Sequence, residues 1–420
     1  MKIAVWHNLP SGGGKRALYQ HIAGLVERGH TVEAWCPPTA DQSYLPLKEL
    51  CRENIVPLRT QAQGWGRALR RYWLVSQMLS AMDDHCRECA SQMNRGGFDL
   101  LFANSCALFQ VAPIAKHVNI PSVLYLQEPF RGLYEALPKS PWAARPKRSG
   151  SFWSLRRCYQ FLSDKSRLPA LRLQVREEIE NASRFKLILV NSLYSRESIL
   201  RAYGLESEVC YLGVDPEKFK PTGEPTDSYV IGLGGLAYNK GVDRAIRAIS
   251  CVDSSKRPEL VWVGNFATAE YENELKTLAA KHGVRLTVKV RVSDAELVSL
   301  LSRASVMLYT SRLEPFGYAP LEANACGTPV VAIAEGGVRE TVQHEQNGLL
   351  VDGDDSAKLA RSIERLIDDR DFAQKLKGQA LAYVRANWTL ESATERLEAA
   401  LRKVKEGALG GCQEKVPAVV

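Results

Sequence analysis

The sequence lacks any long hydrophobic run. None of its apolar stretches approaches the about 20 consecutive residues that a helix needs to cross a bilayer. The segment from Met1 to Pro10 holds one lysine and a short apolar run, which is typical of a first β-strand and too short for the core of a signal peptide. We therefore expect any contact with a membrane to be made from the membrane surface.

The sequence also lacks the cysteine pattern of a disulfide-stapled secreted module. Its ten cysteines are scattered between Cys36 and Cys412 without dense, regular spacing. This distribution favours a reduced, cytoplasmic protein.

No convincing set of metal ligands is present. His85, Cys86 and Cys89 could begin a zinc site, but no second pair of ligands is near them in the sequence, so a helical face is the favoured interpretation. The acidic stretch Asp352–Asp355 is interpreted as the start of a helix, and His7 as a structural residue. We predict no metal site and no cofactor.

A chain of 420 residues with 45% hydrophobic content can bury two ordinary cores, since single cores rarely grow beyond about 250–300 residues. In both halves, short apolar runs alternate with helical patterns, which indicates βαβ units and parallel sheets. Candidate strands are Lys2–Trp6, Thr31–Cys36, Leu100–Ala103, Ser122–Leu126 and Leu187–Val190 in the first half, and Tyr229–Leu233, Leu260–Val263, Leu286–Val290, Val306–Tyr309 and Val330–Ile333 in the second.

Prolines and a glycine interrupt the pattern between residues 213 and 229, which predicts a linker. The expected organisation is an N-terminal domain at 1–215, a linker at 216–228, a C-terminal domain at 229–387, a helix at 388–405 that packs back toward the N-terminal domain, and a disordered tail at 406–420.

A glycine-rich turn joins the first strand to a helix expected from about Lys15 to Arg28. Such a turn, Gly12, Gly13 and Gly14, brings backbone N–H groups close to a phosphate. Glycine also occurs in many strand-to-helix turns for steric reasons alone, so both interpretations stay open.

The densest cluster of chemically informative residues is the stretch 311–331. Here a strand ends, a loop carries Glu314, and a helix begins with Pro320 in its first turn and stops at Gly327. This geometry directs free backbone N–H groups at whatever lies above the strand end. Glu314 in the loop and Glu322 inside the helix should accept hydrogen bonds from hydroxyls of different parts of one ligand.

This cluster resembles the retaining glycosyltransferases of family 4. The resemblance rests on the spacing of Glu314 and Glu322 with Phe316-Gly317 between them, and on further segments in the same order. These are Gly234-Gly235-Leu236 with Lys240-Gly241, Ala332–Gly337 with Glu340, and Asn347–Val351. The family implies an α/β chain of GT-B fold, with two doubly wound Rossmann-like domains and a nucleotide-sugar donor held in the cleft between them.

The resemblance also implies roles for particular residues. Glu314 would contact hydroxyls of the transferred sugar, Glu322 the ribose, and Lys240 the diphosphate, where it stabilises the leaving group. Backbone groups near Gly264 and Arg291 would contact the nucleobase. Backbone amides would hold the diphosphate along Phe316, Gly317, Tyr318, Ala319, Pro320 and Leu321.

Two positions depart from the family pattern. Gly235 stands where the family usually has arginine, and Arg244 or Lys15 could supply the missing cation. Gln127, next to Glu128, stands where a histidine often faces the sugar; it can hydrogen-bond a hydroxyl but cannot titrate.

The net charge of +8 is concentrated in one stretch. Between Arg131 and Arg172 there are ten basic and two acidic residues, with aromatic residues among them, and a similar smaller patch surrounds Trp65. Cations beside aromatic rings are typical of an interfacial membrane anchor. We expect a glycan or lipid-linked acceptor and peripheral contact with an anionic membrane, the alternative being a solvated loop beside a soluble acceptor. No nucleic-acid-binding motif accompanies the charge.

The expected activity is thus a metal-independent hexosyltransferase that uses a UDP- or GDP-sugar. Two alternatives share the fold: a nucleotide-sugar epimerase, and a degenerate donor-binding subunit without turnover. A phosphorylase is disfavoured, because the sequence shows no pyridoxal-phosphate lysine motif.

Overall fold

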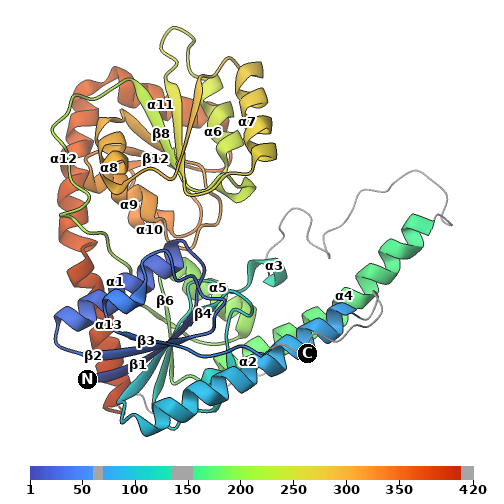
Figure 1. Ribbon diagram of the computed structural model, residues 1–420. Helices are drawn as coiled ribbons and strands as arrows, with labels where there is room; N and C mark the ends of the chain where they lie inside the picture. Colours follow the sequence, from blue (N-terminus) through green and yellow to red (C-terminus); the bar gives the residue numbers. More distant parts are fainter. Residues whose placement is uncertain (60–69, 135–154, 408–420) are drawn as a thin grey trace. The chain divides into compact units, whose positions relative to one another are not determined.

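The computed structural model describes residues 1–59, 70–134 and 155–407, without the side chains of 70–72 and 155–167. The chain forms two compact units (Figure 1). The N-terminal unit comprises Met1–Asn191, Arg196–Cys210 and Thr394–Val420, and the C-terminal unit comprises Ser192–Ser195 and Tyr211–Ala393.

The N-terminal unit is built on a seven-stranded parallel sheet with strand order β3-β2-β1-β4-β5-β6-β7. Its central strands are buried on both faces, which explains their nearly continuous apolar sequence. The strands are β1 (Lys2–Asn8), β2 (Thr31–Cys36), β3 (Arg52–Ile55), β4 (Leu100–Cys106), β5 (Ser122–Tyr125), β6 (Leu187–Val190) and β7 (Glu208–Val209).

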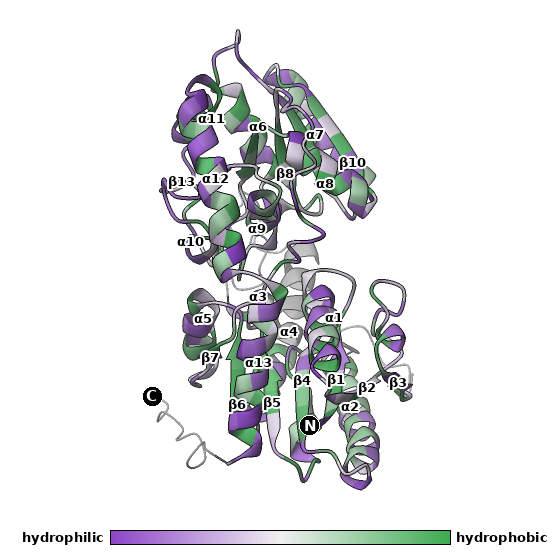
Figure 2. Cartoon of the chain, turned by 90° about the vertical axis from the view of Figure 1, so that its left-hand side faces the viewer, coloured by the Kyte–Doolittle hydropathy of each residue, from purple (hydrophilic) through white to green (hydrophobic). Residues whose placement is uncertain are grey.

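Helices cover both faces of this sheet. Residues of α2 and α5 and the end of α4 share one core cluster with the strands, and α2 and α4 run side by side (Figure 1). In Figure 2 the strands β4, β5 and β6 are largely hydrophobic, whereas α13 carries hydrophilic positions. The helical elements are α1 (Gly13–Glu27), η1 (Leu47–Glu49), α2 (Arg70–Arg95), η2 (Pro113–Lys116), α3 (Arg131–Tyr134), α4 (Leu155–Ala182), α5 (Leu193–Tyr203, in this unit from Arg196) and α13 (Leu390–Lys405, in this unit from Thr394).

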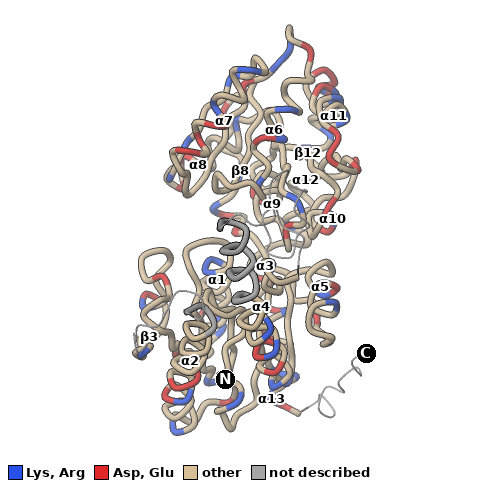
Figure 3. Tube along the Cα trace, turned by 90° about the vertical axis from the view of Figure 1, so that its right-hand side faces the viewer, with Lys and Arg blue, Asp and Glu red and all other residues tan. Residues whose placement is uncertain are grey.

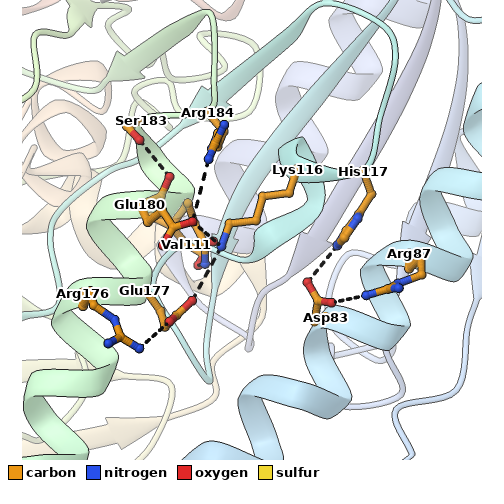
Figure 4. Close-up of polar contacts among 11 residues, drawn as sticks. Asp83, Arg87, Val111, Lys116, His117, Arg176, Glu177, Glu180, Ser183 and Arg184 are labelled. Carbon is orange, nitrogen blue, oxygen red and sulfur yellow. Dashed lines mark hydrogen bonds and ion pairs between the residues drawn. The ribbon is translucent and has the colours of Figure 1, made fainter. Parts of the chain in front are cut away.

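Polar contacts tie α2 and α4 to the segment that follows β4 (Figure 4). Asp83 of α2 pairs with His117 at 2.8 Å, and Lys116 pairs with Glu180 of α4 at 3.2 Å. The Asn181 side chain donates to the Val111 carbonyl at 3.1 Å. These contacts fix the two helices against each other on one face of the sheet.

Helix α13 belongs to the N-terminal unit from Thr394 onward. Gly24 of α1 lies against Thr394 so closely that a Cβ at position 24 would be 2.1 Å from the threonine hydroxyl oxygen. Glu398 accepts hydrogen bonds from Arg28 and His30 at 2.6 and 3.0 Å. The C-terminal helix is therefore anchored on α1 and on the turn after it.

The C-terminal unit contains a six-stranded parallel sheet with strand order β10-β9-β8-β11-β12-β13. One face is packed by α6, α7, α11 and α12 around a single core cluster, while α8 and α10 contact α9. The strands are β8 (Tyr229–Leu233), β9 (Glu259–Gly264), β10 (Leu286–Val290), β11 (Val306–Tyr309), β12 (Val330–Ile333) and β13 (Gly348–Val351).

The outer helices of this unit are amphipathic, whereas α9 is buried almost throughout. Charged residues of both signs are spread over α7, α8 and α11 (Figure 3), so these helices present mixed-charge surfaces to solvent. The helical elements are η3 (Tyr238–Lys240), α6 (Val242–Ser250), α7 (Ala269–Lys281), α8 (Asp294–Arg303), α9 (Tyr318–Ala325), α10 (Val338–Thr341), α11 (Ser356–Asp368) and α12 (Arg370–Asn387).

Both sheets are doubly wound, and the strand order reverses between β1 and β4 in the first unit and between β8 and β11 in the second. In open α/β sheets, ligands bind outside the carboxyl ends of the strands at such a reversal. The segments that follow β1, β4, β8 and β11 are therefore the places to look for a site. The glycine-rich turn Gly12–Gly14 follows β1, and the stretch 311–331 begins just after β11.

Candidate functional site

A glycine-rich loop follows β8 at the strand-order reversal of the C-terminal unit. Gly241 has a φ of 71°, and a Cβ there would lie 2.4 Å from the Thr310 carbonyl oxygen, so only glycine fits. The Thr310 hydroxyl donates to the Gly241 carbonyl at 2.8 Å. The loop that carries Lys240 is therefore fixed on the end of β11.

Lys240 and Glu314 meet at this reversal. The Lys240 ammonium donates to Glu314 Oε1 at 2.7 Å, and the two side chains are 25% and 21% exposed. Lys240 follows β8 and Glu314 follows β11, which are neighbouring strands. A cation and a carboxylate thus stand side by side where a ligand can reach both.

The loop around Glu314 is held by a second glycine pair. The Gly337 N–H donates to the Glu314 carbonyl at 2.8 Å. A Cβ at Gly336 would lie 2.5 Å from that same carbonyl oxygen, and one at Gly337 2.2 Å from the Pro315 carbonyl oxygen. This close backbone approach explains the glycines in the segment 332–337 and fixes the position of Glu314.

Helix α9 begins directly after this loop. Its N-cap, Gly317, has a φ of 100°, and the helix contains Tyr318, Ala319, Pro320, Leu321 and Glu322. The Phe316 ring is buried against Tyr318 and Trp388, so only the backbone of Phe316 can serve a ligand. Glu322 is 2% exposed. Helix α9 therefore starts four residues after Glu314, on the segment that follows β11.

A network of ion pairs surrounds that pair. Arg312 makes a bidentate contact with Glu335 at 2.7 and 2.6 Å, and Asp354 accepts from Arg244 at 2.7 Å. Arg312 also lies 3.9 Å from Asp354. Arg244 Nη1 is buried without a hydrogen-bond partner among the described residues, 3.0 Å from the position of a Cβ on Gly241. The sequence singled out Arg244 as a possible cation for the diphosphate, but not its ion pair with Asp354.

The other predicted donor residues lie on neighbouring strand ends. The Arg291 N–H donates to the Gly264 carbonyl at 2.9 Å, and Arg291 has a φ of 57°. A Cβ at Gly264 would lie 2.7 Å from the Gly234 carbonyl oxygen. The ends of β8, β9 and β10 therefore pack backbone against backbone, and Gly235 belongs to the same edge.

Glu340 has a structural role that the sequence left undefined. Its carboxylate accepts from the backbone N–H groups of Leu193 and Tyr194 at 2.8 and 3.0 Å and from the Tyr211 hydroxyl at 2.8 Å. These residues all belong to the C-terminal unit. Glu340 thus satisfies first-turn N–H groups of α5, a contact between residues far apart in sequence.

In the N-terminal unit, the structure brings the glycine-rich turn and Gln127 together. A Cβ at Gly14 would lie 3.5 Å from the Gln127 amide nitrogen. Helix α1 begins at Gly13, two residues before the expected start, because Gly12 has a φ of 144° and caps it. Glu128, beside Gln127, forms an ion pair with Arg131 at 2.8 Å.

Lys15 is fully buried rather than displayed on the turn. Its ammonium has no hydrogen-bond partner within the described parts of the chain, and burial lowers its pKa. His7, Cys36 and Glu53 are close by in this interior: His7 is 3.2 Å and Cys36 3.6 Å from Glu53 Oε1, and burial also lowers the pKa of His7. These are ligand-type groups for a metal, but the buried ammonium beside them disfavours a cation.

The two other groups that the sequence considered as metal ligands take part in helix structure. His85 Nε2 accepts from the Trp6 indole N–H at 3.2 Å in the core, beside Cys86 and Cys89. Asp355 is the N-cap of α11 and accepts from Ala357 and Lys358. The predicted helix around His85 and the predicted helix start at Asp352–Asp355 are therefore confirmed.

Within the basic, aromatic stretch, residues 135–154 and the side chains of 155–167 lie outside the described residues, as do residues 60–69 around Trp65 and the tail from 408. Arg131 and Arg172 are described. Among the helices that the structure describes, none combines the length and the apolar character needed to span a bilayer.

Two doubly wound parallel α/β units, each with a glycine-rich turn at its strand-order reversal, define the GT-B fold. Solved structures with this fold superpose on nearly the whole chain. A sucrose-phosphate synthase from Thermosynechococcus elongatus has a TM-score of 0.71 at 18% identity and covers 97% of this chain and 100% of its own. Anabaena HepE, in complex with UDP and glucose, has a TM-score of 0.65 at 19% identity and covers 96% of this chain and 99% of its own.

The chain belongs to glycosyltransferase family 4. The family described as Glycosyltransferase Family 4 matches residues 11–218, and the one described as Glycosyl transferases group 1 matches residues 214–382. The resemblance inferred from the residues is thereby confirmed.

Curated relatives match over about half of this chain. D-inositol 3-phosphate glycosyltransferase 1 of Catenulispora acidiphila is 31% identical over 53% of this chain and 58% of its own length. A GDP-mannose-dependent α-(1-6)-phosphatidylinositol monomannoside mannosyltransferase of Mycobacterium tuberculosis is 31% identical over 50% of this chain and 60% of its own. The chain thus spans about three-fifths of the length of these relatives.

Proposed function

We propose that this protein is a retaining, metal-independent glycosyltransferase that moves a hexose from a nucleotide sugar to a glycan or lipid-linked acceptor. The observation that carries the proposal is the Lys240–Glu314 pair at 2.7 Å, placed at the β8/β11 reversal beside the first turn of α9. Family membership supports it.

The chemistry needs positive charge at the leaving group. As the bond between the anomeric carbon and the diphosphate oxygen breaks, negative charge develops on the diphosphate and positive charge on the sugar ring. Lys240 and the N–H groups at the start of α9 stabilise the diphosphate, and Arg244 Nη1 adds a second donor at Gly241. These groups replace the metal ion that other sugar transferases need.

The two glutamates bind hydroxyl groups. Glu314 accepts from hydroxyls of the transferred sugar, and Glu322 of α9 accepts from the ribose. Retention follows from attack on the face that the diphosphate leaves. The acceptor oxygen bonds to the anomeric carbon while the acceptor proton passes to the departing phosphate oxygen, so no protein nucleophile is required.

The donor is proposed to be a GDP- or UDP-sugar, supported by the printed names of the Mycobacterium tuberculosis relative and of the HepE complex. For the acceptor side, we assign the N-terminal unit with Gly12–Gly14, Gln127 and Glu128. The basic stretch between Arg131 and Arg172 supports a peripheral, cytoplasmic-face contact with an anionic membrane. The relative's name, which includes a phosphatidylinositol mannoside, agrees with a lipid acceptor.

The proposal is tested by a binding and product assay. Thermal unfolding is followed with UDP, GDP, ADP and their hexose conjugates, and the nucleotide sugar that stabilises most is then incubated with polyprenyl-phosphate-linked sugars and phosphatidylinositol. We expect one nucleotide series to stabilise the protein and to yield a glycosylated product with the donor's anomeric configuration. Conversion of the nucleotide sugar to its epimer without transfer would instead support the epimerase.

A further inference from the structure

Phe266 is a large aromatic side chain left exposed at the carboxyl edge of the second sheet. It follows β9, and 48% of it is accessible. Its ring lies on the backbone of Gly235: a Cβ at position 235 would be 2.2 Å from ring Cε1 and 2.6 Å from Cζ. The ring therefore occupies the space that any side chain at position 235 would need.

Hydrogen bonds fix the backbone of the segment that carries Phe266. The Leu236 N–H donates to the Phe266 carbonyl at 3.0 Å, and the Gly234 N–H donates to the Val263 carbonyl at 2.9 Å. On the other side, Arg291 Nε donates to the Asn265 carbonyl at 3.4 Å. The segment 264–266 is thus fixed to the ends of both neighbouring strands, and one part of the ring remains open.

The position of the ring along the sheet edge indicates which part of a ligand would contact it. Lys240 Cδ lies 3.3 Å from the position of a Cβ on Gly234, and Lys240 Nζ contacts Glu314. From β9 through β8 to β11, the edge therefore presents an aromatic ring, a cation and a carboxylate. A nucleotide sugar presents the complementary groups in the same order: a flat base, a diphosphate and a hydroxyl-bearing sugar.

We infer that Phe266 is the stacking platform for the nucleobase of the donor. The inference rests on the proposed function and deepens it. Stacking on an aromatic ring tolerates any base, so specificity between bases has to come from polar groups around the ring. The glycine at position 235 and the phenylalanine at position 266 then depend on each other, because the ring needs the space that a side chain at position 235 would fill.

The test compares ligands with and without a base. Whichever of UDP, GDP or ADP binds the wild-type chain is titrated calorimetrically into Phe266→Leu and Phe266→Tyr, and inorganic pyrophosphate is titrated in parallel. Phe372→Leu is the matched control, since it removes a ring that packs under Arg365 of α11. We expect Phe266→Leu to weaken nucleotide binding about tenfold with pyrophosphate binding unchanged, and Phe266→Tyr and Phe372→Leu to bind as wild type.

Two results would overturn the inference. One is wild-type nucleotide affinity in Phe266→Leu, and the other is an equal loss for nucleotide and pyrophosphate, which would make Phe266 a support for the phosphate loop only. In both cases a wild-type chain that still transfers sugar leaves the proposed function standing. If the wild-type chain binds none of UDP, GDP and ADP, both the proposed function and the inference about Phe266 are wrong.

Discussion

Lys240 and Glu314 neutralise each other across neighbouring strands, with 2.7 Å between the ammonium nitrogen and Oε1. Both residues are assigned to the donor, one to the diphosphate and one to the sugar. A donor that binds both must therefore separate them and replace their mutual contact with its own charges and hydroxyls.

Replacing Glu314 by alanine should separate recognition of the sugar from recognition of the nucleotide. We expect transfer to fall by about a hundredfold or more, roughly 3 kcal/mol. Free nucleoside diphosphate should bind as tightly as in wild type or more tightly, because Lys240 loses its competing partner. Steady-state kinetics and calorimetry measure the two effects, with Asp368→Ala, which breaks the exposed pair with Lys256, as the control. Near-normal turnover in Glu314→Ala would remove Glu314 from the site.

Replacing Lys240 by alanine should affect both binding and turnover. The same positive charge contacts the diphosphate in the bound donor and in the transition state. Affinity for nucleoside diphosphate should fall by about tenfold or more, and transfer should fall further. The matched control is Lys256→Ala, which removes a lysine from an exposed ion pair of the same unit. If the diphosphate binds Lys240→Ala as tightly as wild type, the phosphate site lies elsewhere.

Removing divalent cations should leave transfer unchanged. We assign the stabilisation of the negative charge on the leaving diphosphate to Lys240, Arg244 and the N–H groups of α9 rather than to a metal ion. Initial rates in excess EDTA, compared with rates in added Mg²⁺ or Mn²⁺, measure this directly. Activity that disappears in EDTA and returns with either cation would contradict the assignment.

The anchoring of α13 should depend on pH through Glu398. Hydrogen bonds from Arg402, Arg28 and His30 lower the pKa of this carboxyl from its usual 4.5 to about 2. Because the folded-state pKa is depressed, the stabilisation is complete above pH 4.5 and is lost as the pH falls toward 2.

We therefore expect Glu398→Gln to lower the urea midpoint at pH 7, and the gap to wild type to narrow as the pH falls below 4.5. Glu395→Gln, which alters a more exposed carboxylate with a 3.8 Å contact to Arg28, should show little effect at either pH. If the difference in urea midpoint between wild type and Glu398→Gln is the same at pH 7 and pH 3.5, the loss of stability comes from packing rather than from the charge of Glu398.

Much of the fold is predictable because its strands are buried on both faces. The bounds of Thr31–Cys36, Leu187–Val190 and Tyr229–Leu233 coincide with those expected from the sequence. Strand β3, Arg52–Ile55, was not predicted, since it pairs with β2 alone and has a polar sequence without alternation. β7 contains only two residues, too few to form a pattern.

In the site too, single residues could be predicted from the sequence, but the contacts between distant residues could not. The sequence identifies Lys240 and Glu314 separately, but their contact spans 74 positions and follows from the strand order, which no local pattern records. The bidentate Arg312–Glu335 contact depends on the same order. The sequence offers Lys15 as a possible cation for the diphosphate, yet the structure buries it, because α1 turns its side chain toward the strands that carry Cys36 and Glu53.

The most direct test of the account is the release of nucleoside diphosphate from a panel of UDP-, GDP- and ADP-hexoses. The wild-type chain and Glu314→Ala are assayed side by side, with and without a lipid-linked acceptor. The account predicts that wild type releases the diphosphate from at least one nucleotide sugar, faster with acceptor, and about a hundredfold or more faster than Glu314→Ala. Equal rates for the two proteins, or no release from any donor in the panel by wild type, would contradict it.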